Sequence, residues 1–269
     1  MCRMNLRRIF AIYVRQLFLL RHNPTRFVNI FIWITLDVFL WGFITKYLNS
    51  LNTAGFSFVP VLLGAVIFWD FCSRVQQGVM LAFFEDVWSL NFLNLFASPL
   101  QVKEYVSGLI ATSITTSICG FLVMLLLAGF IFGFNILSLG FFLLFFVVII
   151  FIFGMALGIF AAAIVLRFGP SAEWLAWPIP FVLSPLAGVY YPIATLPVPL
   201  QWVSKIIPPS YAFEGIRSVV LTGTASIPQL LTGLALSGMY LLLTYFFFVY
   251  IYRFVLRNGL IARFSAETM

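Results

Sequence analysis

The stretch SPLAGVYYPIATLPVPLQWVSKIIPPSYAFEGIR, residues 184–217, decides the fold class, because it is apolar and yet cannot form one continuous helix. Each proline removes a backbone donor and disfavours helix at the residue before it. Broken apolar backbone is tolerated at membrane depth only where protein or a water-filled cavity shelters it. We therefore expect this segment to dip into a bilayer and turn back, as segments of transport pathways do. Eight of the 13 prolines lie in or just before it: Pro178, Pro180, Pro185, Pro192, Pro197, Pro199, Pro208 and Pro209.

The composition supports a membrane protein independently. Of the 269 residues, 63% are hydrophobic and only 9% are charged, and the mean hydropathy is +1.10. A soluble globule of this length needs more polar surface. The chain is therefore predicted to be a polytopic membrane protein.

Six apolar stretches are long enough to cross about 30 Å of hydrocarbon. The expected fold class is all-α, with six transmembrane helices, an amphipathic interface helix at the N-terminus and a broken, re-entrant region after the fifth helix. The expected domains are 1–26 (interface helix), 27–254 (transmembrane domain, with a loop at 84–104 and the re-entrant segment at 190–217) and 255–269 (cytoplasmic tail). The expected crossings are Phe27–Leu48, Phe58–Phe84, Tyr105–Phe132, Leu137–Leu166, Trp174–Tyr191 and Leu230–Phe254.

The positions of the arginines predict the orientation. Basic residues concentrate on the cytoplasmic side of membrane proteins, and here they precede the first crossing and follow the last. Both termini are therefore expected in the cytoplasm, and the net charge of +7 is explained by topology and anionic lipid without any nucleic acid. These residues are Arg3, Arg7, Arg8, Arg15, Arg21 and Arg26, then Arg253, Arg257 and Arg263.

The first 26 residues are too rich in arginine for a cleavable signal sequence. Arg7, Arg8 and Arg15 fall on one side of a helix whose other side is apolar, which is typical of a helix lying in the membrane surface. Pro24 should end it. The segment has two candidate roles, a simple anchor and a surface that touches a cytoplasmic partner.

Residues for ordinary catalysis are missing from the sequence. Cys2, Cys72 and Cys119 have no paired spacing, and His22 is the only histidine, so neither a disulfide framework nor a metal site is indicated. The phosphate-binding pattern G-x-x-x-x-G-K-[ST] does not occur in the sequence. If the protein uses ATP, the ATPase site must lie on another chain.

A family resemblance rests on SPL, GVYYP, the short LP step and PPSYAFEGIR before the last apolar stretch, with NLFASPL and KEYVSG upstream. This order resembles the permeases of ABC-2 type transporters. The resemblance implies a membrane subunit without cofactors of its own, partnered by an ATPase subunit that holds ATP and Mg²⁺, and by a second permease copy or a sibling. It also implies a bacterial-type cytoplasmic (inner) membrane.

In that family the loop after the second helix inserts into a groove on the ATPase. The resemblance therefore implies this coupling role for the loop at residues 84–104, with Ser98-Pro99 ending its helical part. The other interpretation is an amphipathic helix resting on headgroups. The implied coupling residues are Glu85, Asp86, Trp88, Asn91, Leu95 and Pro99.

Charged residues within the crossings are candidates for a pathway, because burying them in hydrocarbon costs at least ~2.5 kcal/mol. Asp37 lies near the middle of the first crossing and is expected either to pair structurally or to contact the substrate. Asp70 and Arg74, four residues apart, are expected to form a local ion pair. Arg167 and Glu173, flanking a short turn, form a second candidate contact on the cytoplasmic side.

Two groups of residues beside the broken segment are further candidates. Glu214 and Arg217 can pair across one helical turn, and they either close the outer end of a pathway or brace the re-entrant segment. Tyr190, Tyr191 and Tyr211 are the aromatic residues whose position fits a pathway, although packing explains them as well.

The sequence thus predicts a non-enzymatic permease subunit that moves an amphiphilic small molecule, a lipid or a lipid-linked glycan out of the cytoplasm, driven by ATP hydrolysis on another chain. The alternative is an ATP-independent channel or assembly scaffold.

Overall fold

The computed structural model describes residues 5–22, 24–51, 59–89, 95 and 98–260, and every regular element in this part is helical. Within these described residues, four segments are long and apolar enough to cross a membrane: Val59–Trp88, Val102–Phe132, Phe142–Phe168 and Ile227–Arg257. The first consists of the short π-helix η1 (Val59–Leu63) and α3 (Gly64–Trp88). The others are α5 (Val102–Phe132), α6 (Phe142–Phe168) and α11 (Ile227–Arg257).

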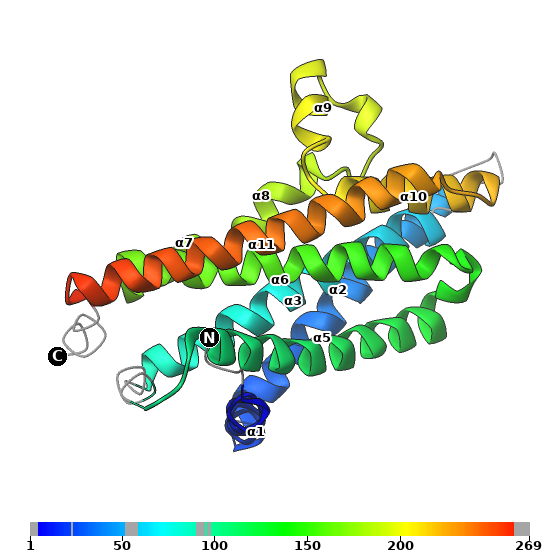
Figure 1. Cartoon of the computed structure of the whole chain (residues 1–269). Helices are drawn as coiled ribbons and strands as arrows, with labels where there is room; N and C mark the ends of the chain where they lie inside the picture. Colours follow the sequence, from blue (N-terminus) through cyan, green and yellow to red (C-terminus); the bar gives the residue numbers. More distant parts are fainter. Residues whose placement is uncertain (1–4, 23, 52–58, 90–94, 96–97, 261–269) are drawn as a thin grey trace.

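Helix α6 is the centre of the bundle. It packs against α3 on one side and α11 on the other, and α5 packs on the far side of α3 (Figure 1). Phe146, Ile149, Ile150 and Phe153 of α6 are almost fully buried. The bundle core is therefore apolar around α6, while many side chains on the outside of α5 and α11 are exposed apolar residues suited to lipid.

Two glycines explain how closely α6 approaches α3. A Cβ added at Gly154 would lie 2.8 Å from the Cys72 carbonyl oxygen, and one at Gly158 would lie 2.7 Å from Val79 Cβ. A side chain at either position would force the helices apart, so this G-x-x-x-G pair sets the contact. The other pair with this spacing, Gly129 and Gly133, makes no comparably close contact.

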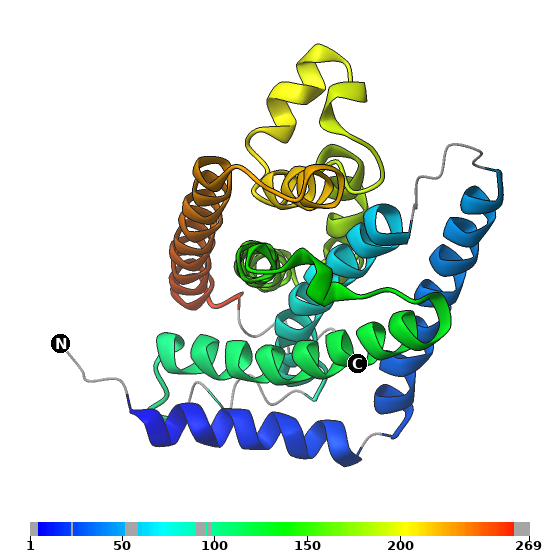
Figure 2. The same ribbon diagram turned by 90° about the vertical axis from the view of Figure 1, so that its right-hand side faces the viewer.

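Two helices precede the bundle. Helix α1 (Leu6–His22) ends just before Pro24, as expected, and α2 (Pro24–Leu51) leads away from it. Figure 1 looks almost along α1 while α6 and α11 run across the view, and Figure 2, turned by 90°, shows α1 lengthwise. Helix α1 therefore lies across the direction of α6 and α11, and it runs alongside α5 (Figure 2).

We call the end of the bundle near α1 the basic end, and the opposite end the far end. The C-terminal residues of α3, α6 and α11 and the first residues of α5 point towards the basic end (Figure 1). The name reflects its arginines, which include Arg7, Arg8, Arg15, Arg21, Arg167, Arg253 and Arg257.

The predicted fifth crossing is broken. After the 3₁₀ turn η3 (Pro170–Ala172), α7 (Glu173–Ala176) and α8 (Ile179–Leu186) are separated at Trp177 and Pro178, and the chain then turns at Gly188, whose φ is +69°. The 3₁₀ turn η4 (Ile193–Thr195) and α9 (Val198–Ser204) project from the side of the bundle in both views (Figures 1 and 2). Helix α10 (Pro209–Thr222) then runs to the far end beside α6 and α11.

Four of the six expected crossings thus correspond to helices that fit a membrane by length and composition. Their bounds differ from the expected ones by a few residues, and the fourth begins at Phe142 because the 3₁₀ turn η2 (Ile136–Leu139) precedes it. The crossings at α2 and at the α7–α10 segment, and the re-entry of that segment into the bilayer, stay predictions.

Candidate functional site

Asp86 is fully buried at the basic end and joins three helices. Its carboxylate pairs with Arg15 of α1 and accepts a hydrogen bond of 2.7 Å from the hydroxyl of Tyr105 in α5. In α1, the next residue, Gln16, donates a hydrogen bond of 3.0 Å from Nε2 to the carbonyl of Ala82. A buried carboxylate needs this number of partners, and its position fixes α1 against α3 and α5.

A second buried carboxylate fixes the start of α1. Glu104 accepts hydrogen bonds from the backbone N–H of Asn5 at 2.8 Å and of Gln101 at 3.0 Å, and it pairs with Arg8 at 3.3 Å. Arg8 also donates to the carbonyl oxygen of Pro99. The loop that enters α5 is therefore held by α1.

These contacts change the interpretation of several predicted residues. Arg8 and Arg15 turn inward and pair with carboxylates, whereas Arg7 is exposed. The carboxylate of Asp86 is fully occupied inside the bundle by Arg15 and Tyr105. A partner protein could therefore touch only the residues next to Asp86. Pro99 is exposed, Glu85 and Leu95 are half-buried, and Asn91 lies outside the described residues.

Trp88 connects the two loops that were expected to face the cytoplasm. Trp88 is 50% exposed, and its indole N–H donates a hydrogen bond of 2.9 Å to one carboxylate oxygen of Glu173 in α7. The other oxygen of Glu173 accepts a 3.4 Å bond from Trp177. Arg167, at the end of α6, lies 4.5 Å from the ring centroid of Phe254. The basic end thus presents one continuous surface built from α3, α6, α7 and α11.

At the broken segment, Arg217 and Glu214 hold the turn after α8. Arg217 is 7% exposed and donates to three backbone carbonyls, those of Gly188, of Val189 at 3.4 Å and of Tyr191 at 2.8 Å. Glu214 accepts a hydrogen bond of 2.7 Å from the N–H of Ile193 and one of 2.9 Å from Arg217. This geometry is compatible with a brace, one of the two roles considered for the pair, and the choice between the roles stays a prediction.

The candidate tyrosines pack in different ways. Tyr190 stacks on Trp41 of α2, with ring centroids 5.1 Å apart and an interplanar angle of 15°, so α2 contacts the broken segment there. The hydroxyl of Tyr211 donates 2.9 Å to the carbonyl of Lys205. Tyr191 is half-buried, and its carbonyl is one of the acceptors of Arg217.

Asp37, Asp70 and Arg74 form a loose charged cluster in the middle of the bundle. All three are half-buried, and both carboxylates interact electrostatically with Arg74. The ion pairs among the described residues do not include the expected pair of Asp70 and Arg74. The i, i+4 spacing therefore brings the charges near each other without direct contact.

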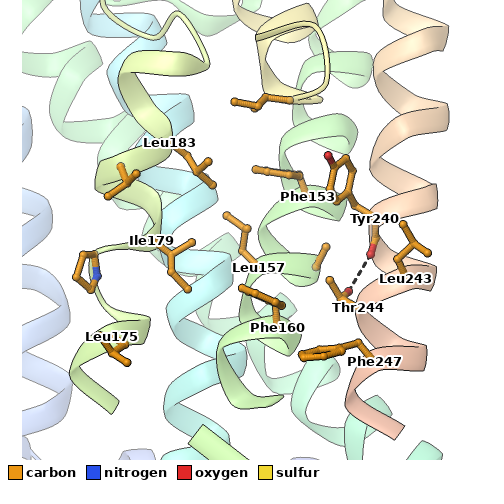
Figure 3. A pocket seen from close by; sticks show the side chains of 14 residues that line it. Phe153, Leu157, Phe160, Leu175, Ile179, Leu183, Tyr240, Leu243, Thr244 and Phe247 are labelled. Atoms are coloured by element: carbon orange, nitrogen blue, oxygen red, sulfur yellow. Dashed lines mark hydrogen bonds between the residues drawn. The ribbon is translucent and has the colours of Figure 1, made fainter. Parts of the chain in front are cut away.

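An apolar groove of about 690 Å³ lies between α6, the α7–α8 segment and α11. Val182, Leu175 and Leu243 are exposed, so the groove opens to the side of the bundle, where a membrane would place lipid. Thr244 and Tyr240 carry the only polar side-chain atoms of the lining, and Thr244 donates 2.9 Å to the carbonyl of Tyr240 (Figure 3). Figure 3 shows the side chains pointing into the space from both walls: Phe153, Leu157, Phe160, Leu175, Ile179, Leu183, Tyr240, Leu243, Thr244 and Phe247.

Comparison with known proteins decides the family. The sequence matches the family described as ABC-2 type transporter over residues 7–221, which includes α1, the long helices α3, α5 and α6, and the braced α8–α10 segment. The chain belongs to this family. The search of curated proteins finds no match.

The ABC-2 subunit is therefore an integral membrane protein of the transporter class, and membership of this family implies an ABC ATPase subunit as partner. Its sequence holds no phosphate-binding loop of its own, as is usual for the membrane domain of this family. The resemblance seen in the C-terminal prolines and in the loop around Pro99 is confirmed at the level of the family.

Some residues of this ABC-2 subunit escaped sequence analysis. Tyr105 was named only as part of KEYVSG and as the first residue of an expected crossing, and the groove was not predicted. Arg15 and Asp86 are 71 residues apart, so no spacing pattern could have paired them. Two adjacent carboxylates near the end of an apolar helix, with arginines on a separate amphipathic helix, were the one available signal.

Proposed function

We propose that this ABC-2 subunit forms the membrane pathway of an exporter that moves an amphiphilic small molecule, a lipid or a lipid-linked glycan out of the cytoplasm. ATP hydrolysis on a separate subunit would drive it. The observation that carries this proposal is the apolar, side-opening groove next to a broken helix whose turn is braced by Arg217. The family match supplies the class of transporter.

The basic end supports the ATPase contact. A half-exposed Trp88, bonded to Glu173, lies where the α3 end and the α7 loop meet, and partly exposed tryptophans that are held in place are typical anchors of protein interfaces. The buried pairs of Asp86 and Glu104 attach α1 to the same region. A push on this surface would therefore move α1, α3 and α5 together.

The groove supports an amphiphilic cargo. Its lining is almost entirely apolar, and its volume of about 690 Å³ lies within the ~300–1,000 Å³ usual for sites that bind small ligands. An acyl chain or the apolar part of a drug fits such a lining, whereas a bare sugar would leave its hydroxyls unpaired. The groove favours a cargo that carries hydrocarbon.

The proposed mechanism is alternating access. Closure of the ATPase subunits displaces the basic end, and the helices beside the groove shift relative to the braced α8–α10 segment. One chain provides half of such a pathway, so we expect a second copy or a sibling subunit, with both termini in the cytoplasm and the complex in a cytoplasmic membrane of bacterial type. The alternative is an ATP-independent channel or scaffold, in which the basic end would bind headgroups only.

Filling the groove tests the cargo. We expect Thr244→Trp, in the complex with its native ATPase in vesicles, to lower ATP-dependent movement of a phospholipid with a fluorescent acyl chain at least about tenfold. Loss of two methylene contacts at ~0.8 kcal/mol each is enough for such an effect.

Leu242→Trp is the matched control, because Leu242 is 60% exposed on the same helix and does not line the groove. This control should transport like the unchanged protein. Equal transport by the two variants would remove the groove from the pathway.

A further inference from the structure

A second, smaller cavity, open on one side, lies between α1, α3 and α5. Its volume is about 50 Å³. In contrast to the groove, six of its nine lining residues have polar side chains, although α3 and α5 are among the segments that are long and apolar enough to span a membrane. Its lining residues are Gln16, Leu20, Arg74, Gln77, Gly78, Leu81, Thr112, Thr116 and Ser117.

Two buried polar atoms at this cavity have no hydrogen-bond partner among the described residues: Ser117 Oγ and Arg74 Nε. Ser117 is 1% exposed. The hydroxyls of its neighbours donate to carbonyls of their own helix: Thr112 donates to Gly108 and Thr116 donates to Thr112, each at 3.1 Å. Ser117 forms no such bond, so its hydroxyl is available to the cavity.

Leaving these atoms unpaired is costly. Burying a polar group without a hydrogen-bond partner costs about 1–3 kcal/mol of folding free energy, and burying a guanidinium inside a bilayer costs more. Arg74 forms no ion pair with Asp37 or Asp70 in the described part of the chain, although both carboxylates act on it electrostatically. The remaining stabilisation must come from whatever fills the cavity.

The size of the cavity selects the occupant. Cavities for drug-sized ligands measure ~300–1,000 Å³, which excludes a sugar or an acyl chain from about 50 Å³. One water molecule needs ~10–15 Å³ and two to four polar partners. The Arg74 guanidinium, the Ser117 and Thr116 hydroxyls and the Gln77 amide supply such partners for a few waters.

We infer that this cavity binds water and hydrates the guanidinium of Arg74 within the spanning bundle. Gln16 and Leu20 belong to α1, so the cavity lies against the helix at the basic end, and water enters from that side. This inference requires α3 and α5 to lie in a membrane and is independent of the cargo and of ATP.

The native cysteines allow a direct test. Cys119 is exposed on α5, two residues from Ser117. At ~100° and ~1.5 Å per residue it lies on the opposite face of the helix at nearly the same depth. In full-length chains without Cys2 and Cys72, we would compare Ser117→Cys, with Cys119 replaced by Ser, against the chain that keeps Cys119 alone.

Ag⁺ is the probe, because it is small and charged, stays out of hydrocarbon and reacts with thiolates. In vesicles with the basic end accessible, we expect Ser117→Cys to react at least about tenfold faster than Cys119, since thiolates form in water and not in lipid. This would hold although Cys119 is the more exposed residue.

Equal or slower reaction of Ser117→Cys would mean a dry cavity and would overturn the inference. Thr116→Cys, which also lines the cavity, provides the same comparison if Ser117→Cys does not accumulate in the membrane. A transport defect with fast Ag⁺ reaction would affect the proposed function only.

Discussion

Replacing Asp86 by alanine is expected to lower the unfolding temperature of the purified protein by about 10 °C, because it leaves Arg15 and the Tyr105 hydroxyl without their shared acceptor. Breaking a buried ion pair costs ~3–5 kcal/mol. For a chain of this size, 1 kcal/mol corresponds to roughly 2–4 °C. The Arg15 side chain is 27% exposed and can recover some solvation, which places the effect at the lower end. Thermal unfolding in detergent, followed by size-exclusion chromatography, measures it.

The control for this prediction is a double-mutant cycle. Arg15→Met alone leaves Asp86 buried and uncompensated, whereas Arg15→Met with Asp86→Met replaces both charges by apolar groups. The double variant should be more stable than either single variant. Arg7→Ala, at an exposed arginine of the same helix, should change the unfolding temperature little. Additive losses in the cycle would contradict the buried pair.

Replacing Arg217 by lysine is expected to abolish transport while the rest of the bundle stays folded. Arginine presents several N–H groups in a fixed plane, and here they reach the carbonyls of Gly188, Val189 and Tyr191 together. A lysine ammonium cannot reproduce this fork, and each buried carbonyl left unpaired costs about 1–3 kcal/mol. We expect transport to fall more than tenfold and the turn at residues 187–197 to become sensitive to protease.

Glu214→Gln is the matched variant. In the unchanged protein the N–H of Ile193 donates a hydrogen bond of 2.7 Å to the Glu214 carboxylate. The amide oxygen of glutamine can still accept this bond, while the negative charge that faces Arg217 is lost. It should keep the turn protected from protease and reduce transport only modestly. If Arg217→Lys retains normal transport and protection, the pair does not brace the segment.

The sequence was informative wherever the cause is local. Prolines act on their own and preceding residues, so the break between Pro178 and Pro209 could be predicted, and so could the end of α1 before Pro24. Long apolar runs likewise predicted α3, α5, α6 and α11 to within a few residues. The pairing of Glu214 with Arg217 follows from a spacing of three in one helix.

The sequence was uninformative where partners meet only after folding. The family resemblance assigned Asp86 to a partner's surface because it lies in the loop at residues 84–104, and its burial depends on Arg15 and on Tyr105, 19 residues further on. Asp70 and Arg74 have the right spacing for a pair, but Arg74 also lies against Gly120 of α5 and interacts electrostatically with Asp37 of α2. No spacing rule describes these contacts. The groove combines residues from four separate stretches of the chain and has no signature in any of them.

Capture of an ATPase by the solubilised chain tests the central claim most directly. The affinity-tagged chain, extracted from its native membrane under mild conditions, should bring down a nucleotide-binding subunit and ATP hydrolysis. Trp88→Ala should reduce the captured activity by about tenfold or more, because an interface tryptophan is often worth at least 2 kcal/mol. Trp202→Ala, which removes a somewhat more exposed tryptophan (63%) from α9, should leave the captured activity unchanged. If the unchanged chain captures no ATPase, the chain is not the membrane half of an ATP-driven exporter, and the channel or scaffold alternative takes its place.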